Sequence, residues 1–528
     1  MTDPIAAYES AAPAGRDGFA QLLRGELTKF RTVRGWIGGL VVGALVLVGF
    51  GLLTAAGSRR ECASVDSASH EVSHACPGLG PLGPGGEAVT DSAYFVHQAV
   101  TGDGTITARV TSLTGLIPSP DPSEPAATGT QPWAKAGIII RASTAQGSSY
   151  AAVMVTGAHG VRLQYDFTND VAGSAIDVSN DSPQWLRLTR TGSAVTAMES
   201  SDGTTWTTIG TVHLAGLSSA TVQVGMFVAS PDFEKTTQQL GGSSSIGGPT
   251  IATATFDHVG LAAGWSAQAW TVDSSDRRPR PTLEPTGPYH ETAGVFTISG
   301  NGDIAPAAGD RDGELVERSL VGAFAGLIAM IVVGVGFATA EYRRGLIRTT
   351  LSASPRRGRV VAAKAVVIGA VTFVAGLVGA ETAYRAVSPV RRANNILTLP
   401  VPTSTEIRIV VGTAALLAVA AVLAMAIGTV LRRGAAAVVV AIALVVAPYI
   451  LSVASVLPSS AANWVLQLTP AAAFAIQQST VRYTQVAGSY TVAQGYFPLS
   501  PFAGFAVLVV WTAAALGLAV FVIRRRDA

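Results

Sequence analysis

The sequence predicts a polytopic α-helical membrane protein with six transmembrane helices, and an all-β sandwich domain inserted between the first two of them. Three observations lead to this fold class. Hydrophobic residues make up 48% of the 528-residue chain and charged residues only 13%, which is too apolar for a typical soluble protein. Several uncharged runs reach the roughly 20 residues that a helix needs to cross a bilayer. The region between the first two runs has short segments of alternating polarity, which are typical of strands.

Each predicted span carries no charged side chain through its middle. The six runs are Trp36 to Thr54, Leu320 to Ala340, Val361 to Ala380, Ile409 to Leu431, Ala435 to Val456 and Phe502 to Ile523. Six crossings return the chain to the side on which it started. Basic residues gather before the first span, between the second and third, between the fourth and fifth, and after the sixth.

The positive-inside rule places these basic clusters and both termini in the cytoplasm, and residues 57–317 outside a plasma membrane. Four arginines on the opposite side are local exceptions to the rule: Arg385, Arg391, Arg392 and Arg408. The formal net charge of +2 gives no overall field that would favour a nucleic-acid partner.

The chain accordingly divides into segments of different character. The predicted segments are a cytoplasmic N-terminus with an amphipathic helix (1–35), the first span (36–56), an extracellular disulfide loop (57–89), the sandwich (90–262), an extracellular linker rich in Pro, Gly and Asp (263–317), and the remaining spans (318–526). Within the last segment, 341–361 is a cytoplasmic loop. Residues 464–478 are apolar but too short to cross and are interrupted by Pro470, which predicts an outer re-entrant element.

Cys62 and Cys76 are the only cysteines. In an oxidising compartment we expect them to form a disulfide, which would stabilise the loop by about 3 kcal/mol on the chain-entropy model. His70 and His74 lie between them, so a mixed Cys and His zinc site is the alternative. Because thiolates outside the cytoplasm are usually oxidised, the disulfide is favoured and no metal is expected.

Three segments of the sandwich resemble the concanavalin-like jelly-roll family: "WAKAGIIIRAS", "QWLRLTRTGSAVTAMESSDGTTWTTIG" and "ATVQVGMFVAS". The likeness covers roughly residues 90 to 262. Many members of that fold bind glycans, and the resemblance implies a possible sugar-facing surface made of Trp133, Arg141, Tyr165 and Trp206. The alternative is that the aromatic residues fill the core between the two sheets. The sequence singles out no pair of carboxylates of the kind that a glycosidase needs.

The membrane half contains almost no ionisable residues inside its spans, so a proton relay is not expected there. The chain also has no G-x-x-x-x-G-K-[ST] loop, and it cannot bind ATP in that manner itself. Energy for any transport must therefore come from another chain.

Two further segments resemble ABC-2 type permeases, the membrane subunits of ABC exporters: "FAQLLRGELTKFRTVRGW" from Phe19 and "EYRRGLIRTTLSASPRRGRVVAAK" from Glu341. The resemblance implies that the loop between the second and third spans docks onto a separate ABC ATPase subunit, and that permeases pair as homodimers or heterodimers. The candidate coupling residues are Glu341, Arg344, Gly345, Arg348, Pro355, Arg356 and Arg357.

The sequence therefore favours a permease subunit with no catalytic residues and no cofactor, whose outer sandwich binds cargo or glycan. The alternative is a membrane-anchored glycan-binding or sensing protein without transport. The large insertion between the first two spans distinguishes the chain from typical permeases and keeps this alternative open.

Overall fold

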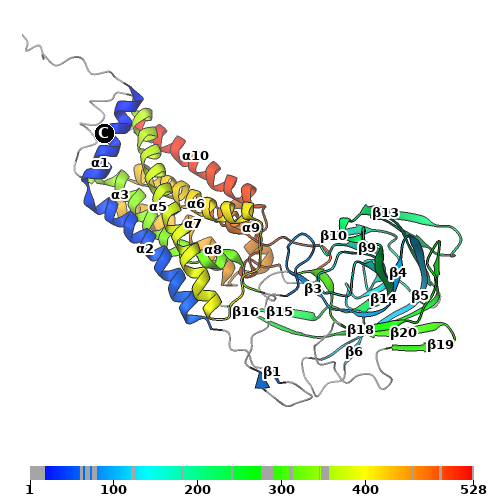
Figure 1. The fold of residues 1–528 in the computed structure, drawn as a ribbon. Helices are drawn as coiled ribbons and strands as arrows, with labels where there is room; N and C mark the ends of the chain where they lie inside the picture. Colours follow the sequence, from blue (N-terminus) through cyan, green and yellow to red (C-terminus); the bar gives the residue numbers. More distant parts are fainter. Residues whose placement is uncertain are drawn as a thin grey trace, which may run out of the picture.

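The computed structural model describes most of the chain. The described residues are 18–59, 64–65, 72–73, 80–119, 126–179, 182–239, 242–274, 289–307, 313–343, 345, 356–454, 456–486 and 490–525. Figure 1 shows a helical bundle attached to a β-rich domain, with α1 (Phe19–Thr32) at the end of the bundle far from the β-rich domain. The C-terminus lies at this same end.

The predicted fold class is confirmed. Within the described ranges, six helices are long and apolar enough to cross a membrane. The bundle consists of α2 (Arg34–Gly57), α3 (Ala323–Arg343), α5 (Arg357–Ala393), α6 (Thr403–Leu431), α7 (Gly434–Val445) with its continuation α8 (Ala447–Val453), and α10 (Pro501–Arg525). Short elements lie around it: η3 (Val316–Leu320), α9 (Ser459–Leu468), η4 (Pro470–Gln477) and η5 (Val492–Gln494).

Helix α6 is the centre of the bundle and packs against α3, α5 and α10. Small residues make this packing close. A Cβ added to Gly334 of α3 would lie 2.4 Å from the carbonyl oxygen of Ala421 on α6, so the two backbones touch at this point. Such close approach is the usual basis of helix association in membranes, where hydrophobic burial gives no net gain.

Two antiparallel sheets form the sandwich. The first has the order β10 (Asn169–Ala172), β9 (Val161–Tyr165), β8 (Tyr150–Thr156), β7 (Lys135–Arg141), β14 (Thr221–Ala229), β4 (Tyr94–Thr101) and β18 (Thr271–Ser274). The second has the order β13 (Thr207–His213), β12 (Ala194–Ser200), β11 (Gln184–Thr191), β5 (Gly104–Ile117), β17 (Ile251–Ala262), β20 (Val295–Gly300) and β19 (Tyr289–Thr292), with β6 (Ala127–Thr128) beside β5. The core between them includes Ile138, Ile140, Leu186, Leu188 and Phe256.

The first sheet is buried on both faces, because a second apolar cluster that includes Ile139, Met154 and Phe227 covers its outer side. Strands β7 and β8 therefore read as continuous apolar runs rather than as alternating ones. Smaller ladders join β1 (Ser64–Val65) to β2 (Val72–Ser73), β15 (Phe233–Gln239) to β16 (Gly242–Gly248), and β3 (Val89–Asp91) to β21 (Ile304–Pro306).

The predicted linker 263–317 is wrong in part, because it contains strands that complete both sheets. Strand β18 pairs with β4, and β20 pairs with β17. Phe296 and Ile298 of β20 are buried in the sandwich core. These strands are short and lie among Pro, Gly and Asp residues, which hid them from a search for longer alternating segments.

Candidate functional site

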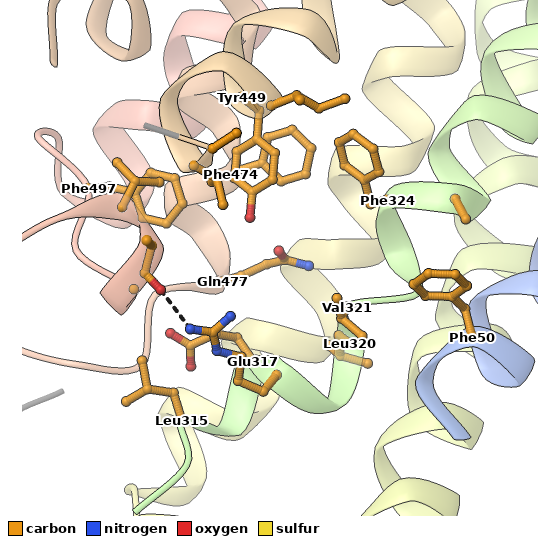
Figure 2. Close-up of a pocket in the computed structure, with 18 residues that line it drawn as sticks. Phe50, Leu315, Glu317, Leu320, Val321, Phe324, Tyr449, Phe474, Gln477 and Phe497 are labelled. Carbon is orange, nitrogen blue, oxygen red and sulfur yellow. Dashed lines mark hydrogen bonds between the residues drawn. The ribbon is translucent and has the colours of Figure 1, made fainter. Parts of the chain in front are cut away.

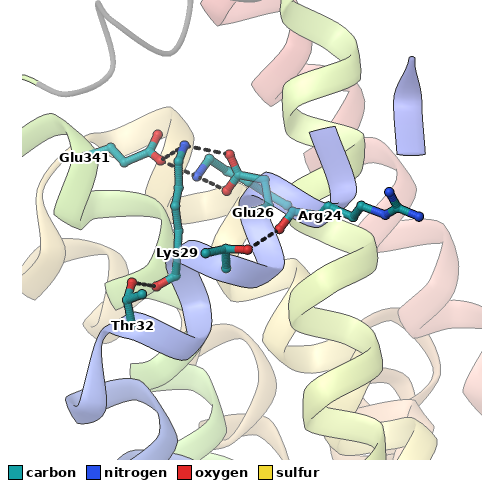
Figure 3. A network of polar contacts seen from close by, with 7 residues as sticks. Arg24, Glu26, Lys29, Thr32 and Glu341 are labelled. Carbon is teal, nitrogen blue, oxygen red and sulfur yellow. Dashed lines mark hydrogen bonds and ion pairs between the residues drawn. The ribbon is translucent and has the colours of Figure 1, made fainter. Parts of the chain in front are cut away.

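A buried network of four charged side chains lies at the end of the bundle away from the sandwich (Figure 3). The Nζ of Lys364 on α5 lies 2.8 Å from Oε2 of Glu26 on α1 and 2.7 Å from Oε1 of Glu341 on α3. The Nζ of Lys29 lies 2.9 Å from Oε1 of Glu26 and 3.0 Å from Oε1 of Glu341. Two cations and two carboxylates thus join three elements that are far apart in the sequence.

Apolar packing beside the network fixes α1 against the bundle. Phe30, one turn after Glu26, is buried, and its ring centre lies 5.8 Å from that of Trp36 and 5.6 Å from that of Phe337. Lys364 Nζ also lies 4.7 Å from the centre of the Phe337 ring. The aromatic cluster keeps water from one side of the charges, which strengthens their attraction.

Lys29 is the most exposed member of the network and belongs to α1, outside the spans. Partial burial of its ammonium group opposes the charge, but hydrogen bonds and the negative charges of Glu26 and Glu341 outweigh this and raise the pKa of Lys29. The lysine therefore stays charged throughout the physiological range.

The predicted coupling residues occupy different surroundings. Glu341 belongs to the charge network and is only 6% exposed. Arg357 Nη1 donates to the carbonyl of Ile523 at 2.6 Å, which ties the start of α5 to the end of α10. Gly345, with φ of +68°, and Arg356 are exposed. The other three predicted coupling residues lie outside the described residues: Arg344, Arg348 and Pro355.

A cavity of about 350 Å³ lies at the opposite end of the bundle, near the sandwich (Figure 2). Its wall comes from α2, from η3 and the start of α3, from α8, from η4, and from residues 492–497. Five aromatic rings dominate this wall: Phe50, Phe324, Tyr449, Phe474 and Phe497. The rings of Tyr449 and Phe474 are stacked with their centres 4.2 Å apart.

Glu317 of η3 is the carboxylate in this wall. Its Oε1 accepts a hydrogen bond from the backbone N–H of Ser479 at 3.2 Å. Its Oε2 is buried and has no hydrogen-bond partner among the residues that the structure describes. Burial raises the pKa of Glu317, although the hydrogen bonds with Ser479 and the charge of Arg318 oppose this rise.

The ionisable groups around Glu317 come from three elements: Arg318 on η3, Arg408 on α6 and Tyr449 on α8. The two arginines are directed at backbone carbonyls. Arg318 Nη2 donates to Ala493 at 2.6 Å. Arg408 donates from Nη1 to Ile476 at 2.8 Å and from Nη2 to Gln478 at 2.7 Å. These bonds hold the irregular segments around the cavity in place.

The four residues predicted to face a glycan do not share one surface. Arg141 is 5% exposed, and its guanidinium makes paired hydrogen bonds to Asp91 at 2.6 and 3.1 Å. Trp133 is equally buried. Tyr165 packs against the sandwich core from β9. Trp206 lies beside the second sheet, with the Arg187 guanidinium 3.6 Å from its ring centre. Of the aromatic residues, Tyr165 packs against the core as the core-filling alternative describes, whereas Trp133 contacts His159 and Arg162; the glycan-facing role stays a prediction.

The predicted cysteine pair lies in a part of the chain that the structure does not describe. Cys62 and Cys76 fall outside the described residues, as do His70 and His74 of the zinc alternative. Strands β1 and β2, which lie between the two cysteines in sequence, pair antiparallel with Ser64 opposite Ser73. Among the residues that are described, no group of three or more His, Cys, Asp and Glu side chains could hold a metal ion.

Six helices that are long and apolar enough to cross a bilayer are typical of an integral membrane protein. The family model of the ABC-2 family transporter protein matches residues 171–528, which is more than half of the chain. The chain therefore belongs to the ABC-2 transporter family and is a permease-type membrane protein.

Solved structures with some similarity match only weakly, and no curated protein matches. A functionally unknown protein from Saccharomyces cerevisiae is 17% identical with a TM-score of 0.21, and the match covers 36% of this chain and 84% of that one. Scytalido-glutamic peptidase is 10% identical with a TM-score of 0.25, over 41% and 100%. The GH43 protein BlXynB from Bacillus licheniformis is 19% identical with a TM-score of 0.16, over 24% of each chain. Scores this low carry no functional argument.

Proposed function

We propose that this chain is the membrane-spanning permease subunit of an ABC exporter and that a separate ATPase subunit energises it. Membership of the ABC-2 transporter family supports a transport role. The absence of a P-loop motif from the sequence supports a second chain as the site of ATP hydrolysis.

In this proposal α1 and both termini lie in the cytoplasm, and the sandwich lies outside the cell. Figure 1 supports this arrangement, because α1 and the sandwich are at opposite ends of the bundle. Basic residues gather at the α1 end, where Arg432 lies 5.2 Å from the ring centre of Tyr342 and Arg357 reaches the end of α10. The exceptional arginines at the sandwich end are engaged locally: Arg391 pairs with Glu314, and Arg408 holds η4. This distribution agrees with the positive-inside rule.

The charge network is the observation that carries the coupling mechanism. Glu341 lies near the end of α3, before residues 344–355, and Lys364 lies near the start of α5, after them. Both are bound to Glu26 of α1, directly or through Lys29. A displacement imposed on the loop by a docked ATPase would therefore move α1, α3 and α5 together rather than bend one helix.

Two such chains, identical or different, would enclose the transport path. Helices α2 and α10 support this pairing, because only 22% of the most apolar 18-residue stretch of each is buried within the single chain. Most of both helices is therefore free to contact a second chain. A glycan-sensing role lacks comparable support, since its candidate residues do not share a surface.

The test is purification of the tagged chain from membranes, followed by measurement of the ATPase activity and the ATPase subunit recovered with it. Arg348→Glu and Arg356→Glu reverse two charges in the proposed docking loop. Arg385→Glu is the matched control, because this arginine is exposed at the sandwich end of the bundle. We expect the loop variants to lose the partner and the control to retain it. Equal recovery from all three variants would refute docking at residues 341–361.

A further inference from the structure

The cavity near the sandwich combines an aromatic wall with one carboxylate oxygen that lacks a partner. Oε2 of Glu317 is buried and unbonded among the described residues, whereas Oε1 is held by Ser479. A buried polar atom without a partner costs roughly 1–3 kcal/mol, and more when the group is charged. A ligand that supplied a donor at this point would recover that free energy.

We propose that this cavity binds an amphiphilic amine, with its apolar body among the aromatic rings and its ammonium group on Oε2 of Glu317. This inference rests on the proposed function, since it names the class of compound that the permease would export. The volume of about 350 Å³ lies in the range of small-molecule sites, and it suits a compact ring system or a short branched chain.

The carboxylate and the aromatic composition of the wall both favour a cation. An ammonium group attracts the carboxylate, and the faces of aromatic rings also attract cations. Tyr449 and Phe474 offer stacked rings above Glu317 (Figure 2). The nearby Arg318 leaves Oε2 open, since this oxygen has no hydrogen-bond partner among the described residues, and Arg318 Nη2 donates to the carbonyl of Ala493.

The mouth of the cavity indicates how the ligand enters. Phe50 of α2 and Ile450 of α8 line the cavity, and they are 45% and 46% exposed on the side of the bundle. Both belong to helices that are apolar enough to span a membrane. The entrance therefore opens toward lipid, and a compound dissolved in the bilayer can reach the site directly. This again points to an amphiphile rather than to a fully water-soluble amine.

Equilibrium dialysis of the full chain in phosphatidylcholine nanodiscs tests the proposal, with empty nanodiscs used to subtract partitioning into lipid. The probes are 1-naphthylmethylamine and its neutral counterpart 1-naphthalenemethanol, which share the ring and differ in the charged donor. We expect saturable binding that favours the amine. Glu317→Gln should weaken amine binding about ten- to a hundredfold, as expected for loss of a hydrogen bond between charged groups, and should leave binding of the alcohol unchanged.

Two further variants make the result decisive. Glu381→Gln is the matched control, because this carboxylate lies on α5 beside Arg385 and does not line the cavity; it should bind both probes normally. Ala325→Phe fills the cavity without touching the carboxylate and should weaken binding of both probes. The proposal is overturned if the wild-type chain shows no saturable amine binding, if amine and alcohol bind equally, or if Glu317→Gln binds the amine normally. Because no ATPase is present, each of these outcomes leaves the docking test of the proposed function standing.

Discussion

Replacement of Lys364 by methionine tests whether the charge network holds together the end of the bundle that lies away from the sandwich. Lys364 is 5% exposed, and its partners Glu26 and Glu341 are 1% and 6% exposed. The substitution leaves two buried carboxylates that share one remaining cation, Lys29. Breaking a buried pair by removal of one partner costs about 3–5 kcal/mol, because the surviving charge stays desolvated.

Lys29→Met provides the comparison within the same network. The Lys29 side chain is 41% exposed, so its ion pairs are screened by solvent and contribute at most about 1 kcal/mol. At roughly 2–4 °C per kcal/mol for a domain of this size, Lys364→Met should lower the apparent melting temperature by about 6–20 °C and Lys29→Met by less than about 4 °C. Heating of detergent-solubilised protein, followed by size-exclusion chromatography of the surviving fraction, measures both shifts.

A double variant separates charge from packing. Glu341→Gln added to Lys364→Met removes the one excess negative charge and leaves Lys29 to pair with Glu26, so it should recover part of the lost stability. If the two lysine variants melted at the same temperature, or if the double variant were less stable than Lys364→Met alone, the network would not be the restraint that we describe.

Three further predictions concern the cavity, the cysteine pair and the sandwich. Burial raises the pKa of Glu317, so amine binding should be complete above this raised pKa and should decline as the pH falls through it, at a higher pH than for an ordinary glutamate. Dialysis across a pH series measures the midpoint of this decline, and Glu317→Gln should abolish the pH dependence. Cys62 and Cys76 should resist alkylation until a reductant is added, and mass spectrometry of the alkylated chain would exclude the disulfide if both thiols reacted at once. Arg141→Met should lower the melting temperature of the chain, because the buried carboxylate of Asp91 would lose its ion-pair partner, which costs about 3–5 kcal/mol of unfolding free energy. An unchanged melting temperature would show that Arg141 has no structural role.

The spans are predictable from the sequence because a soluble domain rarely contains an uncharged apolar run of about 20 residues. The third span is the instructive exception. Its apolar run covers Val361 to Ala380, but α5 extends from Arg357 to Ala393 and even includes Pro389. The apolar run stops at the first charge, whereas the helix continues beyond it, with Glu381 and Arg385 as an ion pair along its surface. Hydropathy identifies the part of a helix that is apolar enough to lie in lipid, but it does not identify the residue at which the helix ends.

Of the two polar sites, the sequence points only to Glu341 of the charge network, as a candidate coupling residue, and not to its partners. Lys364 follows the basic residues of a loop and looks like one of them, because its partner Glu26 lies 338 residues away in the chain. The available signal is weak: Glu26 is an acidic residue on a basic helix, one turn before the apolar Phe30. The cavity has no signal at all, since its wall is assembled from short irregular pieces such as η3 and η4 that no periodic pattern marks.

Helix α3 connects the two sites. Phe324, in its first turn, lines the cavity, and Glu341, near its end, belongs to the charge network. The 17 residues between these positions correspond to about 25 Å of helix at 1.5 Å per residue. Because α3 packs closely on α6 at Gly334, a push on the Glu341 end of the helix would, in the proposed mechanism, also displace the cavity wall.

The same wall is also tied to the sandwich. Gly495 and Phe497 line the cavity, and a Cβ added at Gly495 would lie 2.4 Å from Cδ1 of Leu315, the residue before η3. Earlier in the chain, Gln485 is buried and donates from Nε2 to the carbonyl of Phe167 in the sandwich at 3.2 Å. In the proposed mechanism, a displacement of the cavity wall would reach the β-domain through the hydrogen bond between Gln485 and Phe167. This contact would give the insertion a mechanical role that does not depend on its binding a sugar.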